Sequence, residues 1–196
     1  MTNQRVALFP GTFDPFTNGH LDLARRAARL FDRVVIAVAE STTKGTMFDA
    51  DERCDMIRAC IKSMRRLSVV HFNDLVVDCA RREGAQVMIR GLRAVSDFEF
   101  EFQMALMNRR LARGIEVAFL MPSQQYTYLN ATLVKEIARM GGSIRGLVPR
   151  LVEQRLHARL HPVPAAKSAG TKAGAPGRGA RAGRTALGGG GKTSAR

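Results

Sequence analysis

The stretch RVALFPGTFDPFTNGHLDLARRAARLF, residues 5–31, joins an apolar run, a loop rich in glycine and proline, and an amphipathic segment. The run VALF at residues 6–9 is apolar on both faces, as in strands that are covered on both sides of a sheet. Further on, the apolar residues fall on one helical stripe: Leu21, Ala24, Ala28 and Phe31. The stretch therefore predicts a buried strand, a long loop and a helix, the unit of parallel α/β sheets.

The same alternation continues to residue 160. Short apolar runs predict further strands at residues 34–39, 68–72, 85–90 and 116–121. Helical periodicity, capping signals and helix-ending glycines predict helices at residues 50–64, 74–84, 97–113, 133–141 and 149–160. The order βαβαβαβαβαα indicates an α/β fold, with a doubly wound, Rossmann-like, five-stranded parallel sheet and helices on both faces.

Composition divides the 196 residues into a domain and a tail. The net charge is +14, but residues 161–196 hold seven Lys/Arg and no acid, so each part carries +7. The tail contains nine Gly, nine Ala and three Pro, and it has too few large apolar residues to offset the entropy of ordering. We expect one domain over residues 1–160 and a disordered basic tail over 161–196.

Other features of the sequence argue against a membrane or secreted protein, against disulfide or zinc sites, and against a P-loop. No apolar run approaches the roughly 18 residues that span a bilayer, and the N-terminus lacks a signal-peptide pattern, so we expect a cytoplasmic protein that does not enter membranes. Cys54, Cys60 and Cys79 form no CxxC pair, which favours reduced thiols over disulfides or zinc. The segment ALGGGGKT at 186–193 is one glycine short of a P-loop and lacks the flanking strand and helix, so we assign it no phosphate site.

The loop after the first predicted strand is the leading site candidate. In doubly wound sheets, ligands bind beyond the carboxyl ends of the strands. This loop contains no GxGxxG, which excludes a dinucleotide fingerprint. It does supply the hydroxyl of Thr12 and the imidazole of His20, which stands at the start of a helix whose free amides favour an anion. His20 can therefore donate a hydrogen bond to a phosphate oxygen.

Loops after other strands add groups that suit phosphate. Lys44 follows the second strand, and Arg90 and Arg93 flank Gly91 after the fourth. Two guanidinium groups at one strand end provide forked donors for phosphate. After the fifth strand, Asn130 or Thr132 can cap the next helix, whose amides again point into the crevice. No serine or cysteine nucleophile with a partnered base is apparent, so the residues favour positioning and electrostatic catalysis on phosphates.

Four stretches together resemble a known family. The sequence GTFDPFTNGH at 11–20 is similar to the first signature of the HxGH nucleotidylyltransferase superfamily, in the form found in phosphopantetheine adenylyltransferases. The stretches IRGLRAVSDFEFE at 89–101, MNR at 107–109 and FLMPS at 119–123 resemble the same family. The resemblance covers residues 5–160, and the tail has no counterpart in the usual pattern.

The resemblance implies transfer of AMP from ATP to 4′-phosphopantetheine, which yields dephospho-coenzyme A and pyrophosphate. It implies catalytic roles for Thr12, His20, Lys44 and Arg93. It implies acceptor binding by Thr12, Lys44, Leu75 and Arg90. It implies ATP binding by Thr12, Phe13, His20, Gly91, Leu92, Arg93, Glu101, Tyr126, Thr127, Tyr128, Leu129, Asn130, Ala131 and Thr132. It further implies Mg²⁺ that enters with ATP, a homohexamer, and inhibition by coenzyme A.

One segment departs from the family pattern. Three consecutive serines usually precede LVKE, whereas this chain has Asn130, Ala131 and Thr132. Asparagine and threonine can still cap a helix and donate hydrogen bonds, but Ala131 cannot replace a serine hydroxyl. We therefore expect the backbone contacts of this segment to remain and the contact of the middle hydroxyl to be lost.

Two other functions stay open at this point. Another acceptor, such as a mononucleotide or glycerol phosphate, would suit the superfamily, although the segments at 89–101 favour pantetheine. The basic tail could also make weak, nonspecific contacts with nucleic acid. Against a dedicated RNA-binding protein, the chain has no Trp, only two Tyr and no zinc module.

Overall fold

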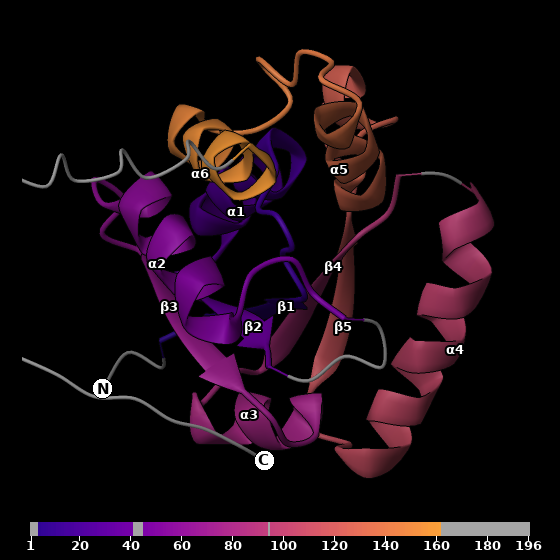
Figure 1. Ribbon diagram of the computed structural model, residues 1–196. Helices are drawn as coiled ribbons and strands as arrows, with labels where there is room; N and C mark the ends of the chain where they lie inside the picture. The colour runs from indigo at the N-terminus through magenta and orange to yellow at the C-terminus, as the bar shows by residue number, and fades with distance from the viewer. Residues whose placement is uncertain (1–3, 41–44, 94, 162–196) are drawn as a thin grey trace, which may run out of the picture. The chain divides into compact units, whose positions relative to one another are not determined.

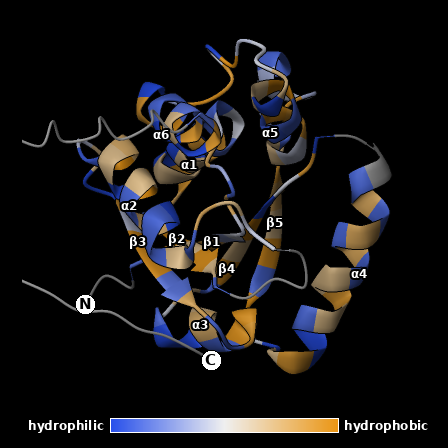
Figure 2. Cartoon of the chain, viewed as in Figure 1, coloured by the Kyte–Doolittle hydropathy of each residue, from blue (hydrophilic) through white to orange (hydrophobic). Residues whose placement is uncertain are grey.

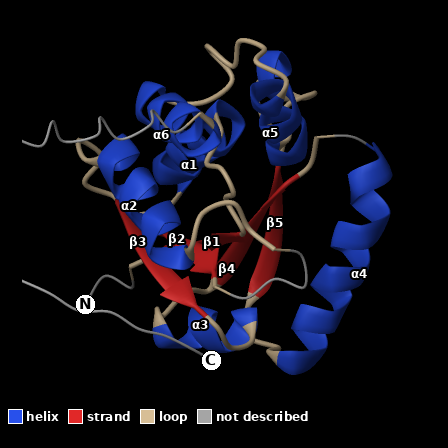
Figure 3. Cartoon of the chain, in the orientation of Figure 1, coloured by secondary structure: helices blue, strands red, loops and turns tan. Residues whose placement is uncertain are grey.

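The computed structural model describes residues 4–40, 45–93 and 95–161 (Figure 1). The strands are β1 (Val6–Gly11), β2 (Arg33–Ala39), β3 (Leu67–Phe72), β4 (Val87–Gly91) and β5 (Glu116–Leu120). The helices are α1 (Asn18–Leu30), α2 (Ala50–Ile61), α3 (Val76–Arg82), α4 (Val95–Leu111), α5 (Ala131–Arg139) and α6 (Arg150–Leu160). A short 3₁₀ turn, η1 (Gln124–Tyr126), lies between β5 and α5. The predicted order of strands and helices is confirmed (Figure 3).

The five strands form one parallel sheet in the order β3-β2-β1-β4-β5. From β1 the chain moves outward to β2 and β3, and then crosses over to β4 on the other side of β1. The winding therefore reverses between β1 and β4. At such a switch point the loops after the two strands diverge and leave a crevice for ligand.

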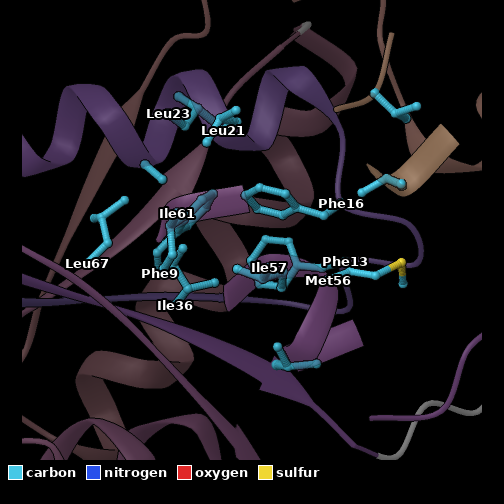
Figure 4. Close-up of a cluster of buried hydrophobic side chains, with 14 of the residues drawn as sticks. Phe9, Phe13, Phe16, Leu21, Leu23, Ile36, Met56, Ile57, Ile61 and Leu67 are labelled. Atoms are coloured by element: carbon cyan, nitrogen blue, oxygen red, sulfur yellow. The ribbon is translucent and has the colours of Figure 1, made fainter. Parts of the chain in front are cut away.

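Both faces of the sheet are buried, as the apolar strands predicted. Ala7 and Phe9 of β1 point into a core that α1, α2, α5 and α6 cover (Figure 4). Val6 and Leu8 point into a smaller core with residues of α3 and the chain beyond α4. Figure 2 shows apolar strands between helices of mixed hydropathy. This double burial explains why the strands read as continuous apolar runs.

Element boundaries differ from the prediction by a few residues. The predicted helix 50–64 ends at Ile61, and the predicted helix 74–84 is shortened to Val76–Arg82. Gly84 has a φ of 66°, a left-handed conformation that glycine adopts readily, and it turns the chain toward β4. Backbone conformation at such turns, rather than side-chain periodicity, sets the ends of these helices.

Three further predictions from the sequence concern the cysteines, membrane-spanning helices and the tail. Cys54, Cys60 and Cys79 are free thiols, as predicted, and burial raises the pKa of Cys60 to about 11. Within the described ranges, no helix is both long enough and apolar enough to cross a membrane. The predicted disorder of the tail and the P-loop-like segment at 186–193 fall outside the described residues.

Candidate active site

Two adjoining cavities lie at the switch point of the sheet. The larger has a volume of about 460 Å³ and lies between the loop after β1, the end of β4 and the start of α5. Ten residues predicted for the site line it: Thr12, Phe13, His20, Arg90, Gly91, Arg93, Glu101, Asn130, Ala131 and Thr132. Segments more than 100 residues apart in the sequence are thus brought to one cavity.

The smaller cavity has a volume of about 260 Å³. It shares five lining residues with the larger cavity: Pro10, Gly11, Thr12, Arg90 and Glu101. Most of the remaining side chains that line it are apolar, among them Phe72, Val76, Phe100, Met104 and Val117. Together the cavities suit an elongated ligand that carries its charge at the junction and an apolar arm on one side.

His20 is fixed in a single orientation by the start of α1. Thr17 caps the helix: its Oγ1 accepts a hydrogen bond from His20 N at 3.3 Å, and its own N–H donates to His20 Nδ1 at 3.0 Å. The imidazole packs edge-on against Phe13, with ring centres 5.1 Å apart, and stacks on Phe16. Because Nδ1 accepts a hydrogen bond, the proton of the neutral ring resides on Nε2.

The electrostatics around His20 favour this neutral ring. Burial, with a smaller effect from the Arg93 guanidinium, lowers the pKa of His20 from 6.5 to about 4. At neutral pH the side chain is therefore an uncharged donor in the wall of the larger cavity. A donor of this kind needs no protonation from solvent in order to contact a phosphate oxygen.

The lowered pKa of His20 predicts an acid-sensitive fold. Between pH 6.5 and about 4 the unfolded chain binds a proton at this ring that the folded protein does not, so the free energy of unfolding falls as the pH is lowered. We expect His20→Ala to lose less of this free energy than the wild type between about pH 7 and pH 5, measured by urea denaturation. His157→Ala, which removes an exposed histidine of α6, should follow the wild type. Identical pH dependence in His20→Ala and wild type would contradict the prediction.

Arg90 stands where the two cavities meet. Its Nε and Nη2 donate to the two carboxylate oxygens of Glu101, each at 2.7 Å, and its Nη1 donates to the carbonyl of Pro10 at 3.1 Å. A bidentate pair of this kind fixes the plane of the guanidinium. Glu101, which the family pattern assigns to the nucleotide, thus also orients the arginine assigned to the acceptor.

Arg93 is held by residues that flank the larger cavity. Its Nε donates to Asp97 at 3.1 Å, and its Nη1 donates to the carbonyl of Leu129 at 3.2 Å. Asp97 lies in the first turn of α4, where an acid compensates the helix dipole. In the structure Asp97 is also the ion-pair partner of Arg93.

Some predicted site residues lie elsewhere. Lys44 falls outside the described residues, although its neighbours Gly45 and Thr46 line the larger cavity. Leu75 is 56% exposed before α3 and lines neither cavity. Five further predicted residues also line neither cavity: Leu92, Tyr126, Thr127, Tyr128 and Leu129. Of these, Leu129 is buried in the core and Tyr128 is exposed.

The start of α5 settles which residue caps this helix. The Asn130 side chain accepts a hydrogen bond from Leu133 N at 2.7 Å and is the N-cap. Ala131 and Thr132 follow it in the cavity wall. The expectation that asparagine replaces serine as a cap is therefore confirmed, and the free amides of the first turn lie next to the cavity.

Sequence reasoning missed two further charged residues of the cavity wall. Asp14 is buried, and its carboxylate accepts hydrogen bonds from Met47 N at 2.9 Å, Phe48 N at 3.1 Å and Lys135 Nζ at 2.7 Å. This cluster joins the loop after β1, the segment before α2, and α5. The available signal was the place of Asp14 within the loop signature GTFDPFTNGH.

Resident metal was not expected from the sequence. Across the described parts of the chain, His, Cys, Asp and Glu side chains form no group of three or more that could hold a metal ion. Among the described residues that line the larger cavity, the cations Arg90, Arg93 and Lys135 outnumber the acids Asp14 and Glu101. These cations, with the free amides at the start of α5, suit an anionic ligand.

Comparisons with known proteins agree with this arrangement. A cytidylyltransferase-like family model matches residues 8–137. The chain is 53% identical over 151 residues to the phosphopantetheine adenylyltransferase of Methylococcus capsulatus, covering 77% of this chain and 93% of that protein. It is 49% identical over 152 residues to the enzyme of the same name from Moorella thermoacetica, covering 78% and 95%.

A solved structure supports the fold. The crystal structure of a putative nicotinate-nucleotide adenylyltransferase from Vibrio parahaemolyticus matches with a TM-score of 0.60 and 17% identity, over 79% of this chain and 92% of that one. At this identity the match speaks for the architecture alone. The two sequence relatives are far closer and agree with the motifs quoted above. The chain belongs to the phosphopantetheine adenylyltransferase family.

Proposed function

We propose that this protein transfers AMP from ATP to 4′-phosphopantetheine, yielding dephospho-coenzyme A and pyrophosphate in coenzyme A biosynthesis. The observation that carries the proposal is the junction of the two cavities at Thr12 and Arg90. The larger cavity, whose wall includes His20, Arg90 and Arg93, suits the nucleotide, and the smaller, more apolar one suits the pantetheine arm. A phosphate at the end of that arm would lie beside Arg90, where it meets the nucleotide.

The chemistry needs no nucleophile from the protein. An oxygen of the acceptor phosphate forms a bond to the α-phosphorus of ATP. The bond from that phosphorus to the oxygen bridging to the β-phosphate breaks, and pyrophosphate leaves with the electron pair. The acceptor is already an anion, so the enzyme must align it and stabilise the charge that shifts onto the leaving group.

The residues of the cavity fit those two tasks. Arg90, fixed by Glu101, would hold the acceptor phosphate, together with Lys44 as the family pattern implies. The Nε2–H of His20 would donate to a phosphate oxygen at the reacting centre, and Arg93 would neutralise the triphosphate. Mg²⁺ would enter as part of the Mg·ATP substrate, since the ATP phosphates themselves supply oxygen ligands.

Pyrophosphate release tests the proposal. We expect release with ATP and phosphopantetheine, and release lower by at least about 1,000-fold with pantetheine, because pantetheine lacks the anionic nucleophile and the group that Arg90 holds. Nicotinate mononucleotide and glycerol phosphate serve as competing acceptors. Faster transfer to either of them, or comparable transfer to pantetheine, would overturn the proposed acceptor.

Assembly and location form a further part of the proposal. We propose a cytoplasmic homohexamer, as the family resemblance implies. In support, α4 leaves several large apolar side chains about half-exposed: Phe98, Phe100, Phe102, Leu106 and Met107. Apolar surface of this kind is typical of contact surfaces between proteins, and Figure 2 shows apolar residues interspersed with polar ones along α4. Light scattering of the purified chain measures the assembly directly.

The tail has its own expected role and test. We propose that residues 161–196 make only weak, nonspecific contacts with nucleic acid through their seven basic residues. Deleting them should leave adenylyl transfer nearly unchanged and the Tm within about 5 °C, the shift that roughly 1 kcal/mol would cause. The deletion should remove most of any RNA affinity at low salt. A larger fall in Tm or activity would show that the tail contributes to the domain.

A further inference from the structure

Arg53 is a buried charge whose hydrogen-bond partners are all carbonyls of the main chain. The side chain, on the first turns of α2, is 1% exposed and is the largest of those that are fully buried. Its Nη1 donates to the carbonyls of Thr12 at 2.7 Å and Ala39 at 2.8 Å. Its Nε donates to those of Phe48 at 3.0 Å and Asp49 at 3.1 Å, and Nη2 donates to Glu40 at 3.4 Å.

Burial of this charge is unfavourable for folding, so stability alone does not explain an arginine at this position. Removing a guanidinium from water is strongly unfavourable, and within the described ranges no carboxylate forms an ion pair with Arg53. The carbonyl bonds offset this cost only while all the acceptors stay in place. An apolar side chain would fill the position on α2 without that requirement.

The carbonyl of Thr12 is the partner closest to the reacting centre. Thr12 lines both cavities, and the next residue, Phe13, has a φ of 52°. The left-handed region is unfavourable for a bulky residue and persists where surrounding contacts hold it. Phe13 packs edge-on against Phe9 and Phe16, with ring centres 5.3 and 5.7 Å apart (Figure 4). The rings hold its side chain, and Arg53 holds the carbonyl that precedes it.

The contacts of Arg53 also join three walls of the site. Thr12 belongs to the loop after β1, Ala39 to the end of β2, and Phe48 to the segment that leads into α2. The last segment is fixed from its other side by Asp14, which accepts from Phe48 N and pairs with Lys135. A rigid guanidinium fork is suited to several carbonyls at once, whereas a lysine ammonium has three donors and no fixed plane.

We propose that Arg53 is a positioning residue for adenylyl transfer, and that it acts by holding the Thr12 carbonyl, and with it the Thr12–Phe13 backbone, at the junction of the two cavities. This inference rests on the proposed function. Arg53 lines neither cavity, so its effect on the reaction is exerted through Thr12. Because the acceptor and the α-phosphorus must meet at that junction, an error in the placement of Thr12 affects turnover more than the binding of either substrate.

The test is a double-mutant cycle on the full chain with ATP and phosphopantetheine. Arg53→Lys keeps the charge but loses the fork, and we expect kcat to fall at least about 30-fold while both Michaelis constants change less than about threefold. In the Thr12→Ala background, Arg53→Lys should lower kcat by less than about threefold, because the Thr12 hydroxyl, whose placement depends on that backbone, is absent.

A matched control separates positioning from folding. Arg33→Lys changes another arginine that donates to a main-chain carbonyl, that of Glu83, at the opposite end of the sheet, and it should leave kcat unchanged. Arg53→Gln, a smaller donor, repeats the cycle if Arg53→Lys does not fold. The proposal is overturned if the losses from Arg53→Lys and Thr12→Ala multiply, if kcat of Arg53→Lys matches that of Arg33→Lys, or if neither Arg53 variant folds. An inactive wild type would instead refute the proposed function.

Discussion

Replacing His20 by alanine should lower kcat at least about 100-fold and change the Michaelis constant for ATP by less than about threefold. The neutral ring offers its Nε2–H to a phosphate whose charge increases as the bond to pyrophosphate breaks. A contact that strengthens in the transition state affects turnover more than substrate binding, and a 100-fold loss corresponds to about 2.7 kcal/mol. Steady-state assays over both substrates measure the two constants.

The control for His20→Ala must account for the capping role of the ring. The alanine variant also loses the acceptor for Thr17 N, so its Tm should fall by several degrees even though it folds. His157→Ala should retain full activity, because that residue is exposed on α6 and remote from the cavity lining. A rise in the Michaelis constant for ATP that equals the loss in kcat/KM would make His20 a simple binding residue.

Arg90→Lys should raise the Michaelis constant for phosphopantetheine at least about 30-fold, with a smaller effect on that for ATP. The guanidinium is held flat at the junction by Glu101 and the Pro10 carbonyl, and lysine cannot reproduce this geometry. Lys44→Ala should act in the same direction, as the family pattern implies. Steady-state assays with each substrate varied in turn measure both effects.

Glu101→Gln separates two roles of the carboxylate. If its main task is to orient Arg90, the variant should also raise the Michaelis constant for phosphopantetheine, by less than Arg90→Lys does. If it chiefly contacts the nucleotide, the constant for ATP should rise instead. Glu116→Gln is the matched control, since Glu116 pairs with Arg109 on the surface at the far end of α4.

Local sequence patterns were sufficient for the fold. Runs apolar on both faces, such as VALF at 6–9, require cover on both sides of a sheet, and amphipathic segments between them supply it. Capping is also a local property: Asp49 stands three residues before Glu52, and the two side chains form a capping box at the start of α2. The positions of Thr12, His20, Arg90 and Arg93 in one cavity followed from the rule that ligands bind beyond the carboxyl ends of strands.

The state of the site residues depended on contacts that no local pattern contains. Nothing near His20 in sequence indicates a pKa of about 4, because the effect comes from burial and from Arg93, 73 positions further along the chain. The bidentate pairing of Glu101 with Arg90 arises because α4 folds back beside the end of β4. Strand order, and therefore the crevice between β1 and β4, is likewise a property of the whole sheet.

Arg53 shows what local sequence patterns predict and what depends on tertiary contacts. It lies one helical turn before the apolar stripe of Met56, Ile57, Cys60 and Ile61, and the sequence by itself determined that α2 packs on the sheet through this stripe. Only the tertiary structure decided why that position holds a charge. Its acceptors include the carbonyls of Thr12 and Ala39, which meet around one guanidinium because the parallel strands β1 and β2 end at the same edge of the sheet.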